Sequence, residues 1–312
     1  MDVSVIIATY NRAEILRETL ASLAALAPRG LAHEVLVVDN NSSDHTRDVV
    51  ESFADRAPVR YLREERQGKN FALNAAIEPA RGELLVFTDD DVLVPPDWLD
   101  RYWEEYQAHP EIGFFGGNIV SQFPEDAPRW ATFPGIRFGQ LDHGAESRVL
   151  RHNEHVHGAN LAIPARLFRG GLRYDTGIGP AVTTARKGSE TSLLVELRRQ
   201  GLDGWFVAGA EVRHRIDCHP QMLSRRYHFR RRFAEARGYV YVGRSPRGTR
   251  TLLGVPAGPL VAVIPAIGRY LFAWITFWDF PRRVAMESEL AWALGRTYEF
   301  WVEARDPERA RS

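Results

Sequence analysis

The sequence predicts an α/β fold in which helices flank a mostly parallel, Rossmann-like sheet and a helical, hydrophobic extension follows. Three observations support this prediction. Strand-like apolar runs alternate with helix-like segments over residues 3–120. Three of these runs end in a cluster of polar residues. Residues 252–280 then form a long apolar stretch whose charged residues are Arg269 and Asp279.

The alternation of elements is typical of a parallel sheet. The predicted strands are residues 3–9, 34–38, 59–62, 83–88 and 112–120. The predicted helices are residues 13–26, a segment from a cap at 42–44 to about residue 54, residues 69–80, and a segment from Pro95-Pro96 to about residue 107. This βαβ order places helices on both faces of the sheet. Sheets of this kind bind ligands at the carboxyl ends of their strands.

Polar clusters follow three of the predicted strands: Thr9-Tyr10-Asn11, Asp39-Asn40-Asn41 and Asp89-Asp90-Asp91. Each cluster taken alone is also compatible with ordinary turn chemistry, because Asn and Asp favour turns. The topology nevertheless brings the carboxyl ends of parallel strands to one edge, so we expect the three clusters to converge.

The three adjacent carboxylates at residues 89–91 repel one another and require a positive partner beside a low-dielectric core. A divalent cation is one such partner, since carboxylate oxygens suit Mg²⁺ or Mn²⁺ and these ions bridge protein carboxylates to substrate phosphates. The sequence has neither a Gly-x-Gly-x-x-Gly fingerprint after its first strand nor a Walker-type loop. We therefore expect side chains and a metal to hold a nucleotide.

Four segments in order, VSVIIATYNR, VVDNNSSDHT, GKNFALNAAI and FTDDDV, resemble glycosyltransferase family 2. The resemblance extends over about residues 1–215. It implies the GT-A fold and an inverting, metal-dependent transferase that moves a sugar from a nucleoside-diphosphate sugar, with UDP the expected nucleotide, to an acceptor hydroxyl. It also implies a setting in cell-surface polysaccharide or glycolipid synthesis.

The resemblance assigns nucleotide binding to Thr9, Tyr10, Arg12, Asp39, Lys69, Asp89 and Asp90. Asp39 matches the carboxylate that recognises the base. Many members of the family have Arg before the second Asn of the third segment, whereas this chain has Leu73 there. That departure gives Lys69 or Arg66 the task of reaching the nucleotide.

The acidic triplet matches the family's Asp-x-Asp motif. We expect Asp91 on the metal, Asp89 near the ribose or the waters of the metal, and Asp90 in either role, because the triplet can be registered one residue either way. His214 ends a predicted strand at a position where some relatives carry a histidine near the metal or the diphosphate, although a lone His is also common as a plain polar residue.

The segments HVHGANLAIP and KGSETSLLVEL resemble the acceptor side of the family. Gly158 and Asn160 then bind the acceptor, and Glu190 is the catalytic base, where most relatives have Asp. The alternative for Glu190 is a helix N-terminal glutamate favoured by the helix dipole. The histidines of HNEHVH lack a Cys or carboxylate partner at a recognised metal-ligand spacing, which disfavours a structural metal there.

Composition limits the remaining function classes. Formal net charge is zero, which argues against nucleic-acid binding. The one cysteine, Cys218, excludes an intrachain disulfide and favours a reducing, cytoplasmic location. We expect three regions: a nucleotide-sugar subdomain at 1–115, an acceptor-binding and catalytic subdomain at 116–218, and an Arg-rich and apolar helical region at 219–312.

The C-terminal region has several interpretations. Residues 221–237 concentrate arginines, of which Arg225 and Arg226 are candidates for the donor diphosphate. The alternatives are a phosphate-bearing acceptor, contact with anionic lipid and a solvated helix face. QMLSRRY only approximates the Gln-x-x-Arg-Trp motif of processive relatives, so polymer synthesis is not inferred.

For residues 252–280, we expect prolines to break the stretch into interfacial or re-entrant helices on the cytoplasmic face of a membrane. The alternative is a flap packed on the enzyme or on a dimer partner. Residues 288–303 read as a closing helix.

Two rival functions come from other classes. A non-catalytic nucleotide-sugar or glycan-binding module of a membrane complex would bind a nucleotide without turnover, and the intact acidic triplet with Glu190 argues against it. A sugar-phosphate nucleotidyltransferase would need a glycine-rich N-terminal loop, whose place is taken by Ala8-Thr9-Tyr10.

Overall fold

The computed structural model describes residues 1–133, 136, 138–179, 186–243, 251–252, 255–276 and 280–305. The chain forms two compact units. The first, here called the sheet unit, comprises residues 1–122, 139–176 and 189–218. The second, here called the helical unit, comprises residues 123–138, 177–188 and 219–312.

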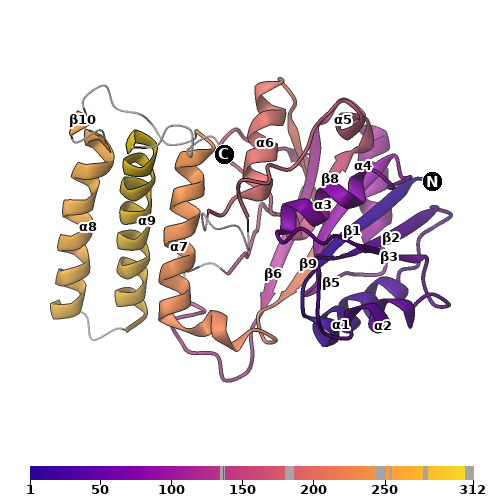
Figure 1. The fold of residues 1–312 in the computed structure, drawn as a ribbon, viewed down its shortest axis with the longest axis horizontal. Coiled ribbons are helices and arrows are strands. Elements are labelled where there is room, and N and C mark those ends of the chain that lie inside the picture. Colours follow the sequence, from indigo (N-terminus) through magenta and orange to yellow (C-terminus); the bar gives the residue numbers. More distant parts are fainter. Residues whose placement is uncertain are drawn as a thin grey trace. The chain divides into compact units, whose positions relative to one another are not determined.

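A nine-stranded sheet organises the described part of the sheet unit (Figure 1). Its strands are β1 (Val3–Thr9), β2 (His33–Asp39), β3 (Val59–Arg63), β4 (Leu84–Asp89), β5 (Val92–Leu93), β6 (Phe114–Gln122), β7 (Arg148–Val149), β8 (Leu161–Pro164) and β9 (Gly204–Arg215). Their order is β3-β2-β1-β4-β8-β6-β9-β5, with β7 paired to β9. Strands β1 to β4 are mutually parallel, whereas β8 runs antiparallel to both of its neighbours.

Helices cover both faces of this sheet. They are α1 (Ala13–Ala24), α2 (Thr46–Glu51), α3 (Lys69–Ile77), α4 (Trp98–Ala108), α5 (Ala165–Arg169) and α6 (Ser189–Arg199), with a 3₁₀ turn η1 (Gly158–Asn160) before β8. Alternate residues of β1 face opposite layers, as strand geometry requires. Val5 packs with the apolar residues of α1, α2 and α4, and Ile6 with those of α3, α5 and α6.

The predicted fold class is confirmed, and most predicted elements lie within a few residues of the observed ones. Helix α2 ends at Glu51, about three residues earlier than predicted, and at its start Asp44 accepts the backbone N–H of Thr46 at 3.1 Å. The short strands β5, β7 and β8 were not predicted. Strands on both sides of the predicted boundary at 115/116 share one sheet, so that division of roles stays a prediction.

Asn160 connects three elements inside the sheet unit. Its fully buried side chain accepts hydrogen bonds from Trp98 Nε1 (3.0 Å) and Tyr102 Oη (2.7 Å) and donates to the carbonyls of Asn118 (2.9 Å) and Ala210 (2.6 Å). The side-chain amide of Asn160 is thus fully used within the core, and its predicted role in acceptor binding stays a prediction.

We expect Asn160→Ala to lower the free energy of unfolding by about 3–5 kcal/mol, because two buried donors and two carbonyls lose their partners. Urea denaturation followed by circular dichroism measures the change. The control is Asn153→Ala, since Asn153 is exposed and an exposed substitution changes stability by about 0.5 kcal/mol or less. Equal effects of the two variants would contradict this account of Asn160.

The helical unit contains three long helices, α7 (Arg225–Tyr241), α8 (Ala257–Thr276) and α9 (Phe280–Arg305), together with the turn η2 (Pro220–Leu223) and the short pair β10 (Thr251–Leu252) and β11 (Val255–Pro256). Helix α9 lies between α7 and α8 (Figure 1). It contains the helix predicted over residues 288–303 and extends it at both ends.

Helix α8 corrects the prediction that prolines break the apolar stretch 252–280. The helix is continuous from Ala257 to Thr276. Pro259 lies in its first turn, where a backbone N–H has no helical partner to lose, and Pro265 removes a single internal hydrogen bond. Residues 253–254 and 277–279 of the stretch, including Asp279, lie outside the described residues.

A buried charge network joins α7 and α9 to the segment that precedes α6. Glu299, fully buried, accepts from Arg186 Nε at 2.6 Å and from Arg237 Nε at 2.7 Å. The Arg186 guanidinium also lies over the ring of Tyr241, 4.4 Å from its centroid. The neighbouring Lys187 donates its backbone N–H to the carbonyl of Ala234 in α7. The segment that leads toward α6 is thus anchored on α7 and α9.

We expect Glu299→Gln to destabilise the protein by about 3–5 kcal/mol, because two buried guanidinium groups lose their counter-charge. The matched control is Glu289→Gln in the same helix, which breaks an exposed pair with Arg269 and costs at most about 1 kcal/mol. Thermal unfolding of both variants tests the comparison. A loss for Glu299→Gln no larger than the control's would show that the buried pair contributes little.

Candidate functional site

The three predicted polar clusters lie together at the carboxyl edge of the parallel strands. Thr9 at the end of β1 is in register with Asp39 at the end of β2, and Ala8 is in register with Asp89 at the end of β4. The loops that follow these strands are therefore neighbours at one edge of the sheet. This is the convergence that the βαβ order predicts.

Two basic side chains neutralise the acidic triplet. Arg12 Nη1 lies 2.9 Å from Asp90 Oδ1 and 3.3 Å from Asp91 Oδ2. Lys69, at the start of α3, donates to Asp89. Each carboxylate of the triplet therefore has a cation beside it, which makes three adjacent negative charges tolerable at the end of a buried strand.

The charges of this cluster shift one another's pKa values. Burial, reinforced by Asp91 and Asp89, raises the pKa of Asp90 despite its contacts with Arg12 and Thr9. Burial acts to lower the pKa of Arg12, but Asp90 and Asp91 outweigh it and raise the pKa of the guanidinium. Asp89 and the other nearby carboxylates likewise raise the pKa of Lys69 against the effect of burial. Both cations stay charged at neutral pH.

Asp91 and His214 form the pair best suited to hold a divalent cation. Strand β5 pairs Val92 with His214 of β9, and this register brings His214 Nε2 to 3.3 Å from Asp91 Oδ1. A carboxylate and an imidazole are ligands that Mn²⁺ accepts, whereas Mg²⁺ favours oxygen. Across the described residues no cluster of three or more His, Cys, Asp or Glu is suited to a metal. A cation here would therefore take its other ligands from water and a diphosphate, as such ions commonly do.

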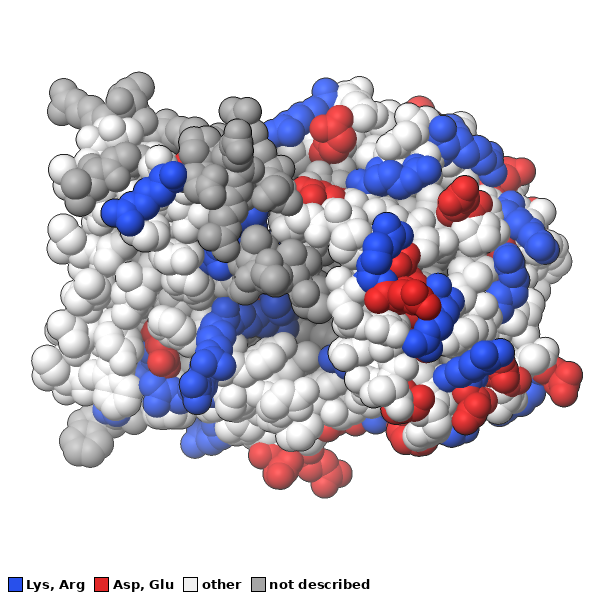
Figure 2. Space-filling view, in the orientation of Figure 1, with Lys and Arg blue, Asp and Glu red and all other residues white. Residues whose placement is uncertain are grey.

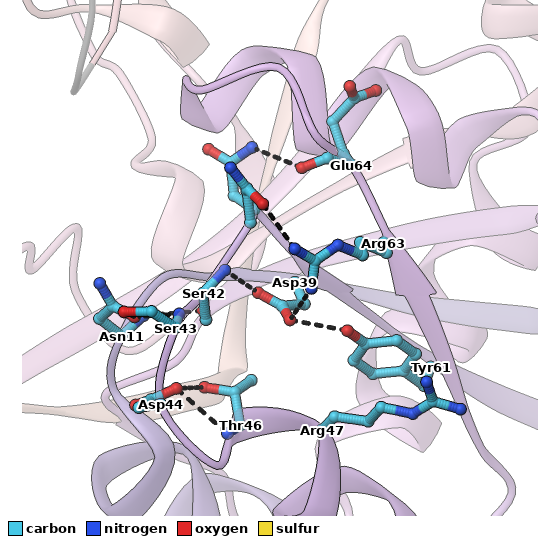
Figure 3. A network of polar contacts seen from close by, with 12 residues as sticks. Asn11, Asp39, Ser42, Ser43, Asp44, Thr46, Arg47, Tyr61, Arg63 and Glu64 are labelled. Carbon is cyan, nitrogen blue, oxygen red and sulfur yellow. Dashed lines mark hydrogen bonds and ion pairs between the residues drawn. The ribbon is translucent and has the colours of Figure 1, made fainter.

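The loops after β1 and β2 are joined around Asp39 (Figure 3). Asp39 is buried and accepts from Tyr61 Oη (2.7 Å) and from the backbone N–H of Ser42 (2.7 Å). Arg63 Nη1 lies 3.9 Å from the same carboxylate. Burial, followed by the bond to Asp39, raises the pKa of Tyr61. Tyr10 lies on the neighbouring loop and is exposed.

Asn11 fixes the two loops to each other. It adopts a positive φ of 52°, a conformation that asparagine tolerates better than most residues. Its backbone N–H donates to Ser42 Oγ at 2.9 Å, and its side-chain oxygen accepts from the backbone N–H of Ser43 at 2.7 Å (Figure 3). Asp44 on the same loop accepts the backbone N–H of Ala13, where α1 begins.

Glu190 lies in the first turn of α6, as the sequence predicts. Its Oε1 is 3.7 Å from His157 Nδ1, and a side chain on Gly158 would come within 3.9 Å of its Cβ. Burial alone would raise the pKa of this carboxyl, but His157, together with the positive charge of Lys69, lowers it to about 2. Glu190 is therefore ionised at neutral pH. Lys69 acts electrostatically on both Glu190 and Asp89, so the glutamate and the acidic triplet share a cation.

Four residues near this site were not predicted from the sequence as site residues. Asn70 and Asn74 of α3 donate to the backbone carbonyls of Asp175 and Tyr174, and so hold the segment next to β4. The buried hydroxyl of Tyr174 has no hydrogen-bond partner among the described residues, and burial, followed by the negative charges of Glu190 and Asp89, raises the pKa of this phenol. His157 is the fourth. The four-residue spacing of Asn70 and Asn74 in GKNFALN places both on one helix face, and this pattern could have indicated their shared role.

The remaining predicted arginines have other partners. Arg66 donates to Glu64 and lies over the ring of Phe71, so Lys69 rather than Arg66 contacts the triplet. Arg225, in the helical unit, donates to Glu287 at 2.8 Å, and Arg226 is exposed. Their predicted contact with the diphosphate is untested and stays a prediction.

Curated relatives match about two fifths of the chain. The glycosyltransferase AglE of Haloferax volcanii is 31% identical over 141 residues, which are 43% of this chain and 46% of that protein. Validoxylamine A glucosyltransferase of Streptomyces hygroscopicus subsp. jinggangensis is 40% identical over 148 residues, 40% of this chain and 34% of that protein. The succinoglycan biosynthesis protein ExoM of Rhizobium meliloti is 32% identical over 127 residues, 40% of each chain. The chain thus spans less than half the length of these relatives.

Solved structures share the fold over nearly the whole chain. The mannosyltransferase PcManGT of Pyrobaculum calidifontis, in complex with GDP-Man and Mn²⁺, has a TM-score of 0.62 at 18% identity and covers 96% of this chain and 87% of that one. Residues 1–349 of TarS from S. aureus, in complex with UDP, have a TM-score of 0.56 at 13% identity over 99% and 92% of the two chains. These likenesses show the GT-A fold.

The sequence profile of "Glycosyl transferase family 2" matches residues 4–165. This region contains all four segments on which the resemblance was based, and it is just over half of the 312 residues. The chain belongs to glycosyl transferase family 2.

Proposed function

We propose that the protein transfers a sugar from a nucleoside-diphosphate sugar to an acceptor hydroxyl with inversion at the anomeric carbon. One observation carries the proposal: Thr88, the residue before Asp89, donates to the carbonyl of Ala159 at 2.9 Å, and His157, two residues before Ala159, lies 3.7 Å from Glu190. The candidate donor site and the candidate base therefore lie at the same edge of the sheet. An ionised carboxylate beside a site for an electrophilic sugar is what general-base catalysis requires.

Glu190 is the proposed base. Its low pKa keeps it ionised, and His157 holds its carboxylate on one side. It takes the proton of the acceptor hydroxyl as that oxygen attacks the face opposite the leaving group, so the configuration inverts. Arg12 and Lys69 are positively charged groups at the acidic edge and are suited to stabilise a departing nucleoside diphosphate.

Asp91 and His214 are the proposed ligands of a divalent cation, Mn²⁺ or Mg²⁺. When bound, such an ion neutralises charge on the phosphates of the leaving group. The mannosyltransferase similar in fold was solved with Mn²⁺, and the donor set here suits that ion. Asp89 and Asp90 are proposed to contribute to donor binding through the ribose or through waters of the ion.

UDP is the proposed nucleotide. Asp39, at the end of β2, offers a carboxylate that can accept from the ring N–H of a base, and a GT-A relative in fold was solved with UDP. Thr9 and Tyr10 contribute to the same nucleotide site, and Gly158 leaves room for the acceptor beside Glu190. The proposed setting is the synthesis of a cell-surface polysaccharide or glycolipid at the cytoplasmic face of a membrane.

The first test is thermal stabilisation by UDP, GDP, dTDP and CDP, each with and without Mn²⁺. A nucleotide at a hundred times its dissociation constant stabilises the fold by about 2.7 kcal/mol. We expect UDP to act most strongly and to require the metal. Asp91→Asn is expected to weaken the metal-dependent binding about tenfold or more, equivalent to about 1.4 kcal/mol.

Asp55→Asn is the control, because Asp55 is exposed and far in sequence from the triplet. An unchanged affinity in Asp91→Asn would move the metal role to another member of the triplet. If none of the four nucleotides stabilises the protein, the transferase proposal fails.

Glu190→Gln is expected to keep nucleotide binding and to lower the release of UDP from UDP-sugars by about 10²- to 10⁴-fold, the usual contribution of a general base. Glu196→Gln in the same helix is the control, since Glu196 is half exposed. A pKa of about 2, lowered from 4.5, means that the charge of Glu190 is fully present above about pH 4.5 and is lost only as the pH falls toward 2.

Between pH 5 and 8, as a result, kcat of the wild-type protein should show no titration of Glu190. Normal turnover in Glu190→Gln would refute the base assignment. Nucleotide binding without any turnover in the wild-type protein would instead favour a non-catalytic nucleotide-sugar-binding module.

A further inference from the structure

Helix α8 exposes a continuous apolar face. Four large aliphatic side chains recur at intervals of three, seven and four residues and therefore share one side of the helix. Their exposed fractions are 62% for Val261, 72% for Ile264, 54% for Leu271 and 83% for Ile275. In Figure 2, the left margin of the molecule, where α8 lies in Figure 1, is drawn largely in white, the colour of uncharged residues. A patch of this kind marks an interaction surface.

The charges of the three helices favour an anionic partner. Helices α7, α8 and α9 contain eleven arginines and five glutamates. Their exposed charged residues are Arg226, Arg230, Arg269, Arg282 and Arg305, against Glu289 alone. A cavity of about 230 Å³ between the three helices is lined by Arg232, Arg269 and Arg296 beside one carboxylate, Glu289. Guanidinium groups in such numbers suit phosphate.

Trp274, toward the end of α8, adds an amphipathic anchor. Two guanidinium groups flank its ring, that of Arg225 at 5.3 Å and that of Arg283 at 4.9 Å from the centroid. Phe280 completes the cluster under Arg225. Tryptophan and arginine together are typical of the depth at which phospholipid headgroups meet acyl chains.

The packing of α8 on α9 argues against a helix that crosses the bilayer. By length and composition α8 could span one, since it has 20 residues and a mean hydropathy of 1.5. However, Thr297 Oγ1 of α9 donates to the carbonyl of Pro259, and Arg269 Nε donates to Glu289 at 3.0 Å. These two contacts hold α9 alongside α8. A crossing α8 would draw the charged residues of α9 into hydrocarbon, at a large cost in free energy.

We propose that the helical unit docks on an anionic phospholipid surface, with α8 lying flat at the boundary between headgroups and acyl chains. The aliphatic face enters the boundary, and exposed arginines of the helical unit, Arg269 and Arg282 among them, bind lipid phosphates. The inference deepens the membrane setting of the proposed function and names the partner. A second copy of the chain is a poorer occupant, because a symmetric contact would bring the same arginines of both copies together.

Depth measurements on vesicles test the orientation. Cysteines carrying an environment-sensitive fluorophore replace Val261, Ile267 or Ile275 in a Cys218→Ser background, which removes the one native cysteine. On vesicles that contain phosphatidylglycerol, all three labels should shift to the blue and be quenched equally by a shallow quencher. Val149→Cys in the sheet unit, exposed by 47%, is the control and should not change. Deep quenching at Ile267 alone would show a crossing helix and overturn the proposal.

Sedimentation with vesicles tests the two forces separately. Ile264→Asp with Ile275→Asp is expected to weaken binding about a hundredfold or more, because two large apolar side chains no longer enter the lipid. Arg269→Gln and Arg282→Gln are each expected to weaken binding to anionic vesicles about fivefold and to leave binding to phosphatidylcholine unchanged. Val149→Asp, in the sheet unit, is the matched control.

Light scattering of the same variants tests whether a second copy of the chain, rather than lipid, covers the aliphatic face of α8. A wild-type dimer that Ile264→Asp converts to a monomer, with no vesicle binding, would assign the face to a second copy and overturn the proposal. A monomer that ignores anionic vesicles would overturn it as well. These measurements use neither donor nor acceptor, so their failure is distinguishable from a failure of the transferase assignment.

Discussion

The neutralisation of three adjacent carboxylates at the end of a buried strand is the constraint around which the sheet unit is arranged. Asp89, Asp90 and Asp91 are tolerated because Lys69 and Arg12 lie beside them. The two cations come from the starts of different helices, so both helices must be correctly docked for the charges to balance. Two cations beside three carboxylates leave one negative charge at this edge, which suits the binding of a divalent cation.

Lys69 also connects the acidic triplet to the candidate base, Glu190. It lies within electrostatic reach of Glu190, whose pKa it lowers together with His157. One lysine therefore couples a cluster suited to binding a leaving group to a carboxylate suited to accepting a proton. The asparagines of the same helix hold the segment at Tyr174 and Asp175. Helix α3 thus serves as a shared support for both halves of the candidate site.

The helical unit combines a buried ion-pair network with an exposed apolar helix face. Its interior is held by a buried carboxylate, Glu299, between Arg186 and Arg237, whereas its α8 face leaves large aliphatic groups in water. The buried network pairs charged groups inside the unit, and the exposed face leaves apolar surface available to an external partner.

Hydrophobic periodicity, turn residues and the order of motifs determined the α/β class, the parallel strands and the edge at which the clusters meet, because these features depend on neighbours in sequence. Only the tertiary structure decided the roles of individual polar side chains. Asn160 matches a ligand-binding segment but is enclosed in the core, and His157, one of the three histidines of HNEHVH, faces Glu190. Continuity of α8 through Pro265 was likewise decided by tertiary structure, since packing on α9 compensates for one lost hydrogen bond. Such outcomes depend on contacts between residues far apart in the chain, which no local pattern contains.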